Sequence, residues 1–220
     1  MNPIHNELKK EFQVERMILF SDAVFAIAIT LLALEIKVPE LADNVTESSL
    51  LSELARLIPK FVGFLISFFL VGLYWTIHHR MFGFVVNFTR KLIWLNLFFL
   101  LSIVMMPFST GIFGEYSSPH SIYLKTPLII YVLNICFTGV MNYLLWCHIA
   151  NPANKISEGI PNKAFVQAAK IRALVVPVVF ALAIPIDFVN PYLARYTPML
   201  IPLVMKLLKK RFEKRITVKE

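Results

Sequence analysis

The sequence predicts an all-α membrane protein with six transmembrane helices per subunit. Of its 220 residues, 57% are hydrophobic and only 16% are charged. The mean hydropathy of +0.66 is too high for a soluble domain, which must cover itself with polar side chains. Six apolar stretches approach the roughly 20 residues that a helix needs to cross the hydrocarbon. Lys and Arg gather on one side of these stretches, as they do in multi-pass proteins.

The predicted spans follow one another without a long linker, so we expect one transmembrane domain over residues 1–220. They cover residues 17–38, 57–77, 92–113, 122–146, 171–188 and 191–208. The last two spans are short and contain prolines, which are tolerated in a bilayer only where neighbours satisfy the freed carbonyls. We expect Asp187, Asn190 and Pro191 to form the tight turn between these two spans.

The distribution of basic residues predicts the orientation in the membrane. With the N-terminus inside, 17 of the 22 Lys and Arg residues lie on the inner side. The five on the outer side are Lys37, Arg56, Lys60, Lys125 and Arg195. Because positive charge favours the cytoplasmic side, we expect both termini in the cytoplasm and the lipid bilayer as a partner. This topology accounts for the net charge of +8, so no nucleic acid partner is predicted.

The first predicted helix carries small and ionisable residues within an apolar run. One stripe of it, about 80° wide, has the spacing of a helix that packs along a seam. The stripe consists of Phe20, Ala23, Ile27, Thr30, Leu31 and Leu34. Asp22 points away from this stripe. Because an ionised carboxylate facing lipid costs several kcal/mol, we expect Asp22 to face protein or water and to have partners.

The second predicted helix returns to the depth of Asp22, which suggests partners for it. Ser21, Asp22, His78 and His79 can join in one polar network, with Arg16 as a further member. The alternative is an ordinary interfacial cluster in which the two histidines lie at the headgroups. We expect Asn96, Asn134 and Asn142 to form hydrogen bonds between helices, worth about 0.6 kcal/mol each.

Several motifs carry a family resemblance. The segment from Arg16 to Asp22 fits the pattern RxxxFSD, and the run AVFAIAITLL follows it. Three further segments follow in the chain. They are LYWTIHHR, which contains Trp75, His78 and His79, then LNLFFL and MPF. Together they resemble the prokaryotic branch of the endolysosomal potassium channel family, transmembrane protein 175. The resemblance is clear in the first half of the chain.

The resemblance implies a homotetramer in a prokaryotic plasma membrane, with four first helices lining a central pore for monovalent cations. The narrow part of the pore maps onto Ile27, Thr30 and Leu34, within the stripe identified above. A ring of Ile27 side chains would form a hydrophobic constriction, and Thr30 hydroxyls would offer oxygen dipoles to a permeating potassium ion. No cofactor is expected. The chain contains no TVGYG segment, in agreement with this family. The spacing by itself is more often a sign of bundle packing than of pore lining, and only the resemblance reverses this preference.

Two other classes of function remain to be compared. A secondary transporter would use Asp22 with His78 or His79 as a titrating pair. It would also need broken helices at the midplane, whereas the first helix has no Gly or Pro before Pro39. An intramembrane enzyme would need a nucleophile or a metal cluster deep in the bilayer, which the Ser, Cys and His spacing does not supply. We therefore expect that the protein is not an enzyme.

Overall fold

The computed structural model describes residues 10–39 and 46–217. The helices in this part of the chain are α1 (Lys10–Leu34), α2 (Glu47–Arg56), α3 (Ile58–Phe82), α4 (Arg90–Val104), α5 (Met106–Glu115), α6 (Lys125–Ile149), η2 (Pro152–Asn154), α7 (Lys163–Val189), α8 (Pro191–Tyr196), η3 (Thr197–Met199) and α9 (Leu200–Thr217). Five segments of the described residues are long and apolar enough to cross a membrane, namely Phe12–Leu34, Ile58–Phe82, Arg90–Glu115, Lys125–Ile149 and Lys163–Val189. The predicted class, an all-helical multi-pass membrane protein, is confirmed.

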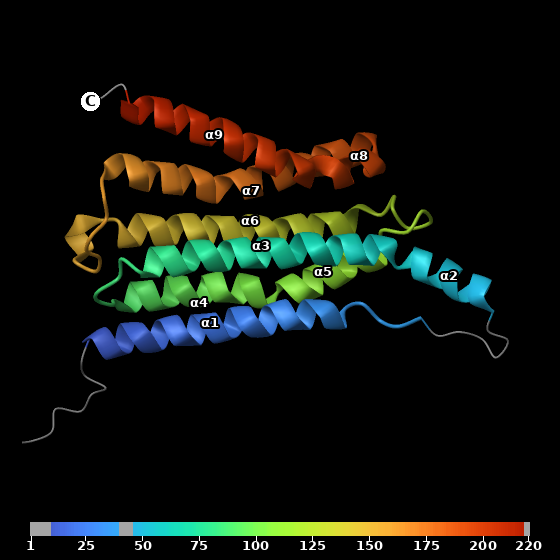
Figure 1. Ribbon diagram of the computed structural model, residues 1–220, viewed down its shortest axis with the longest axis horizontal. Coiled ribbons are helices and arrows are strands. Elements are labelled where there is room, and N and C mark those ends of the chain that lie inside the picture. The colour runs from blue at the N-terminus through green and yellow to red at the C-terminus, as the bar shows by residue number, and fades with distance from the viewer. Residues whose placement is uncertain (1–9, 40–45, 218–220) are drawn as a thin grey trace, which may run out of the picture.

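The long helices lie side by side and alternate in direction (Figure 1). α1 forms one edge of the bundle and contacts α3, α4 and α5. α6 packs on α4, α5 and α7, and α9 runs back along α7 at the opposite edge. The start of α1 and the end of α9 lie at the same end of the bundle. α1 therefore has neighbours from its own subunit on one side only.

The third predicted span, residues 92–113, is interrupted in the structure. α4 ends at Val104 and α5 begins at Met106, with Met105 between them. Pro107 follows at the second position of α5. Because proline has no N–H and its ring crowds the carbonyl four residues earlier, the hydrogen-bond ladder cannot run through unchanged. The two helices still form one continuous span.

The ends of the first and fifth spans also differ from the prediction. α1 ends at Leu34 instead of residue 38, before the polar stretch that leads to Pro39. α7 begins at Lys163, well before residue 171. The Asn162 side chain accepts a hydrogen bond from the Phe165 N–H at 2.8 Å and caps α7. Apolarity alone missed the first turns of α7 because Lys163, Gln167 and Lys170 interrupt the apolar run.

The last predicted span, residues 191–208, is not a single α-helix in the structure. The chain forms α8, the short η3 and then α9, which extends to Thr217. Pro198 lies at this junction, where it cannot continue the hydrogen bonds of α8. The sequence analysis also missed α2, whose Thr46 accepts a hydrogen bond from the Ser49 N–H while the Ser49 hydroxyl accepts one from the Thr46 N–H.

Candidate functional site

α1 has two faces with opposite surroundings. Ser21, Phe25, Ala28 and Leu32 are buried against the rest of the subunit. The stripe formed by Phe20, Ala23, Ile27, Thr30, Leu31 and Leu34 lies on the opposite face, and all six residues are exposed. Ile27 is 59% exposed and Leu34 is 72% exposed. The stripe is therefore unpacked within one subunit, and the alternative that it belongs to the subunit's own core is wrong.

Within the stripe, the Thr30 hydroxyl has a defined orientation. Its Oγ1 donates a hydrogen bond to the Ile27 carbonyl at 2.8 Å. Because the single hydroxyl proton is used inside the helix, the lone pairs of the oxygen remain available as acceptors. Ile27 and Leu34 lie about one turn before and after this oxygen. The three residues thus offer one oxygen layer between two apolar layers.

A buried hydrogen-bond network fastens the opposite face of α1. The Ser21 hydroxyl donates to the Met17 carbonyl at 2.8 Å, so its oxygen accepts from Asn96 Nδ2 at 3.0 Å. This fixes the orientation of the Asn96 amide, whose Oδ1 accepts from His78 Nε2 at 2.9 Å. The His78 ring is also stacked on Phe82, with ring centroids 4.0 Å apart. One network therefore joins α1, α3 and α4.

Asp22 belongs to a separate contact. Its Oδ1 accepts a hydrogen bond from Trp75 Nε1 at 2.9 Å. The Trp75 ring lies beside the His79 ring, with centroids 5.6 Å apart. Asp22 therefore has a protein partner, as expected, although the partner is neither histidine.

The prediction of one network that includes Ser21, Asp22, His78 and His79 holds for Ser21 and His78, which Asn96 joins, but not for Asp22 and His79, which lie beside Trp75. Adjacent residues on a helix point about 100° apart. In the pairs Ser21–Asp22 and His78–His79, the first residue therefore faces the interior and the second faces the outer surface. Arg16 does not join either contact; its guanidinium lies over the Phe12 ring, 5.8 Å from the centroid. Because His78 is bonded to Asn96 and Asp22 to Trp75, the titrating pair required by the transporter hypothesis does not form.

The asparagine predictions have mixed outcomes. Asn96 bridges three helices, and Asn134 Nδ2 on α6 donates to the Ser109 hydroxyl on α5 at 3.2 Å. Both are hydrogen bonders between helices, as predicted. The prediction is wrong for Asn142, which is fully buried but has no hydrogen-bond partner for either side-chain atom within the described part of the chain.

An ionic cluster at the other end of the bundle was missed. Asp187 is only 2% exposed, and its two oxygens each lie 3.1 Å from a cation, Lys125 Nζ on one side and an Arg195 nitrogen on the other. Arg195 also donates to the carbonyls of Pro191 and Ile122, at 2.8 and 3.2 Å. The cluster joins the start of α6, the end of α7 and α8. The sequence signal for this cluster was Asp187, a single acid in an apolar run, but the sequence analysis assigned Asp187 only to a turn.

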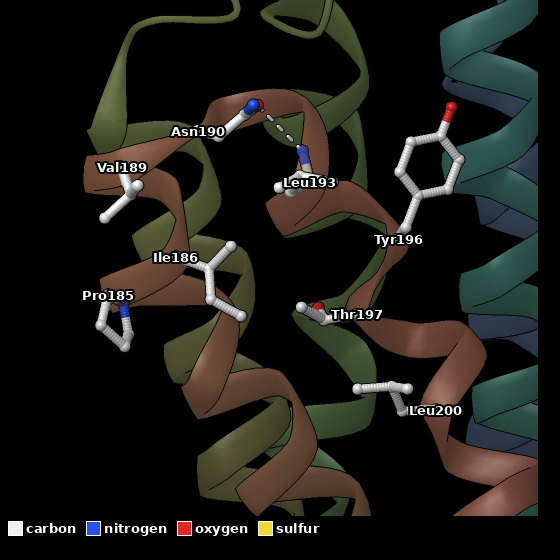
Figure 2. Close-up of a pocket in the computed structure, with 8 residues that line it drawn as sticks. All are labelled: Pro185, Ile186, Val189, Asn190, Leu193, Tyr196, Thr197 and Leu200. Carbon is white, nitrogen blue, oxygen red and sulfur yellow. Dashed lines mark hydrogen bonds between the residues drawn. The ribbon is translucent and has the colours of Figure 1, made fainter.

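A cavity of about 640 Å³ lies between the end of α7, α8 and the start of α9 (Figure 2). It is lined by Pro185, Ile186, Val189, Asn190, Leu193, Tyr196, Thr197 and Leu200. The Asn190 oxygen is occupied by the Tyr192 and Leu193 N–H groups, which it caps as expected for the predicted turn. The lining is otherwise mainly apolar, and the cavity lies at the edge of the bundle away from α1. It is therefore separate from the exposed stripe.

Comparison with known proteins identifies relatives of this arrangement. A protein of Chryseobacterium sp. (strain P1-3), named a potassium channel, is 30% identical over 90% of this chain and 95% of its own length. A potassium channel of Streptomyces collinus is 30% identical over 78% of this chain and 81% of its own length.

The solved structures include a similar fold. The crystal structure of a lysosomal potassium-selective channel TMEM175 homolog from Chamaesiphon minutus has a TM-score of 0.71 and 28% identity. The match covers 89% of this chain and 97% of that chain. The model of the endosomal/lysosomal potassium channel TMEM175 family matches residues 16–107, which contain the RxxxFSD segment, α3 and α4. With these relatives over nearly its whole length, the chain belongs to the TMEM175 family, in its prokaryotic branch.

Proposed function

We propose that this protein is a potassium-permeable cation channel, a homotetramer in which four α1 helices line a central pore. The observation that carries the proposal is the exposed stripe of α1. Only 22% of the α1 span is buried in the subunit, against 33% to 50% in the other four spans. One helix cannot enclose an aqueous path, so a closed ring of subunits is required. The related bacterial proteins are named potassium channels.

In this assembly, Ile27 forms the main constriction. An apolar ring blocks ions because they would shed water without gaining ligands. The Thr30 hydroxyl donates its proton to the Ile27 carbonyl. Its oxygen can therefore accept a hydrogen bond from water in the pore or contact the cation directly. Leu34 forms a second apolar layer. Selectivity for potassium over sodium is modest, because few neutral ligands are offered.

The Ser21–Asn96–His78 network and the Asp22–Trp75 bond have a structural role. They hold α1 in a fixed rotation on α3 and α4, which keeps the stripe directed at the pore axis. Asp22 thus does not bind the permeating ion. No catalytic step is assigned to any of these residues, and the separation of Asp22 from both histidines favours a channel over a proton-coupled carrier.

We further propose six membrane crossings, with α8, η3 and α9 forming the last. α9 runs back along α7, which brings the end of α9 to the side where α1 begins (Figure 1). That side carries most of the Lys and Arg, so it is the cytoplasmic side of a prokaryotic plasma membrane.

The test is a reversal-potential measurement in planar bilayers, with potassium on one side and sodium on the other. We expect single-channel openings and a reversal potential shifted modestly toward potassium. Thr30→Ala should change the permeability ratio more than the conductance, because it removes the oxygen layer. Absence of discrete openings, with slow saturable flux in vesicles, would support a carrier and contradict the proposal.

A further inference from the structure

The two loops at the end of the bundle where α1 begins are joined to one another. The Val86 N–H donates to the Ile156 carbonyl at 3.0 Å, and the Glu158 N–H donates to the Phe84 carbonyl at 2.9 Å. Ile156 is fully buried. The α3–α4 loop and the α6–α7 loop therefore form one packed unit.

His148, in the last turn of α6, lies between these loops with a partner on each ring nitrogen. Nε2 lies 3.0 Å from Thr89 Oγ1, at the start of α4. Nδ1 lies 3.1 Å from Asn154 Nδ2, in η2 of the α6–α7 loop. The same Asn154 nitrogen donates to the His148 carbonyl at 2.7 Å, which identifies it as the amide NH2 group.

These contacts fix the protonation state of the ring. An amide NH2 can only donate, so Nδ1 must be an unprotonated acceptor, and Nε2 must carry the proton of the neutral ring. Nε2 then donates to Thr89 Oγ1, which also accepts from the Leu92 N–H at 3.1 Å and caps α4. A second proton on Nδ1 would face the hydrogens of Asn154, so the imidazolium cannot keep this bond.

We infer that His148 is a pH-sensitive latch, which holds the α6–α7 loop to α4 when neutral and releases it when protonated. The latch is closed above the range in which imidazole titrates and opens as the pH falls through it. Lys91 on α4 is the charged group that acts on the ring.

The latch is connected to α1 through a single helix. Thr89 precedes α4, and Asn96 follows two turns later on the same helix face. Asn96 holds Ser21 of α1. Release of Thr89 therefore alters the position of the helix that anchors the proposed pore helix. This step rests on the proposed channel function, whereas the protonation of the latch does not.

The first measurement concerns the ring itself. In protein labelled with 15N at histidine and asparagine, in nanodiscs, we expect the His148 signal, assigned by its loss in His148→Gln, to show the Nε2–H tautomer at pH 8. As the pH is then lowered in steps from 7.5 to 4.5, the ring should gain a second proton while the Asn154 side-chain amide signals shift. An Nδ1–H tautomer at pH 8, or Asn154 signals that do not change, would overturn the inference.

The second measurement is the potassium current as a function of pH on the latch side. Gln offers an amide acceptor and a donor but does not titrate, so His148→Gln should keep the latch closed. We expect a change in current of about fivefold or more in the wild type and none in this variant. His120→Gln, the same substitution in an exposed loop, is the control and should retain the wild-type response.

An equal pH response in His148→Gln would refute the coupling to the pore. If no current is found at any pH while the ring titrates as expected, the latch stands and the proposed channel function fails.

Discussion

Toward the end of the bundle where α1 begins, neutral hydrogen bonds join the helices, whereas at the opposite end a buried carboxylate joins them through two cations. The first group is the Ser21–Asn96–His78 network, and the second is Asp187 with Lys125 and Arg195. Losing a neutral partner costs about 1–3 kcal/mol, whereas losing one member of a buried ion pair costs about 3–5 kcal/mol. The ionic end should therefore set the stability, and the neutral end should set the position of α1.

The largest effect is expected for Asp187→Asn. The substitution preserves size but leaves two cations without a counter-charge, so we expect a loss of about 3 kcal/mol of unfolding free energy. Lys125 is partly exposed and can reach water, which keeps the loss near the lower limit. Denaturant unfolding in detergent measures it. A smaller loss than that of Asn96→Leu would reverse the ranking of the two ends.

Asn96→Leu should cost less stability but more function. It leaves Ser21 Oγ and His78 Nε2 without their bridging partner, a loss of about 1–3 kcal/mol. We also expect a lower yield of the proposed tetramer, because α1 loses its fixed rotation. Asn134→Leu, which removes a single bond to Ser109, is the matched control and should assemble normally. Equal tetramer yields in both variants would show that the Ser21–Asn96–His78 network does not contribute to assembly.

Asp22→Ala tests the outer contact of α1. Trp75 Nε1 would lose its acceptor at a half-exposed site, so we expect about 0.5–1.5 kcal/mol of destabilisation and a reduced tetramer yield. Asp22→Asn keeps an acceptor oxygen and should behave nearly as the wild type. Native mass spectrometry measures the yield. Normal assembly of Asp22→Ala with altered ion selectivity would place Asp22 on the ion path.

The smallest effect is expected for Glu53→Gln in α2. Glu53 and Arg56 form an ion pair at 2.9 Å, but the Arg56 side chain is 75% exposed. Such pairs contribute about 0–1 kcal/mol because water and salt screen them. The unfolding free energy should change by about 0.5 kcal/mol at most. A loss comparable with that of Asp187→Asn would mean that an ion pair stabilises this protein equally whether it is buried or exposed.

The sequence predicts best what depends on apolar length and helical period. Five spans and the stripe of α1 follow from these two properties, and the stripe is exposed as a single face. Interruptions depend on local hydrogen bonding, so the break at Met105 and the separation of α8 from α9 were missed. α2 has polar residues throughout its first turn and no apolar run of spanning length.

Contacts between helices were predicted less well. Depth along the membrane brought Ser21, Asp22, His78 and His79 to one level, but rotation divided them between two contacts. The sequence does not give the relative rotation of α1 and α3, which depends on how Phe25, Phe82 and Phe99 pack around His78. Asp187 was underestimated for a related reason, because its partners are distant in sequence.

The central claim is that the exposed stripe of α1 lines the ion path, and the single-channel conductance of Ile27→Asn tests it most directly. The amide would hold water in the constriction, so we expect a higher conductance, a lower potassium selectivity and an unchanged fold. Leu133→Asn is the control, because Leu133 on α6 is 58% exposed but lies on another helix; its conductance should equal that of the wild type. Unchanged currents in Ile27→Asn, together with an increase in Leu133→Asn, would show that α1 does not line the pore.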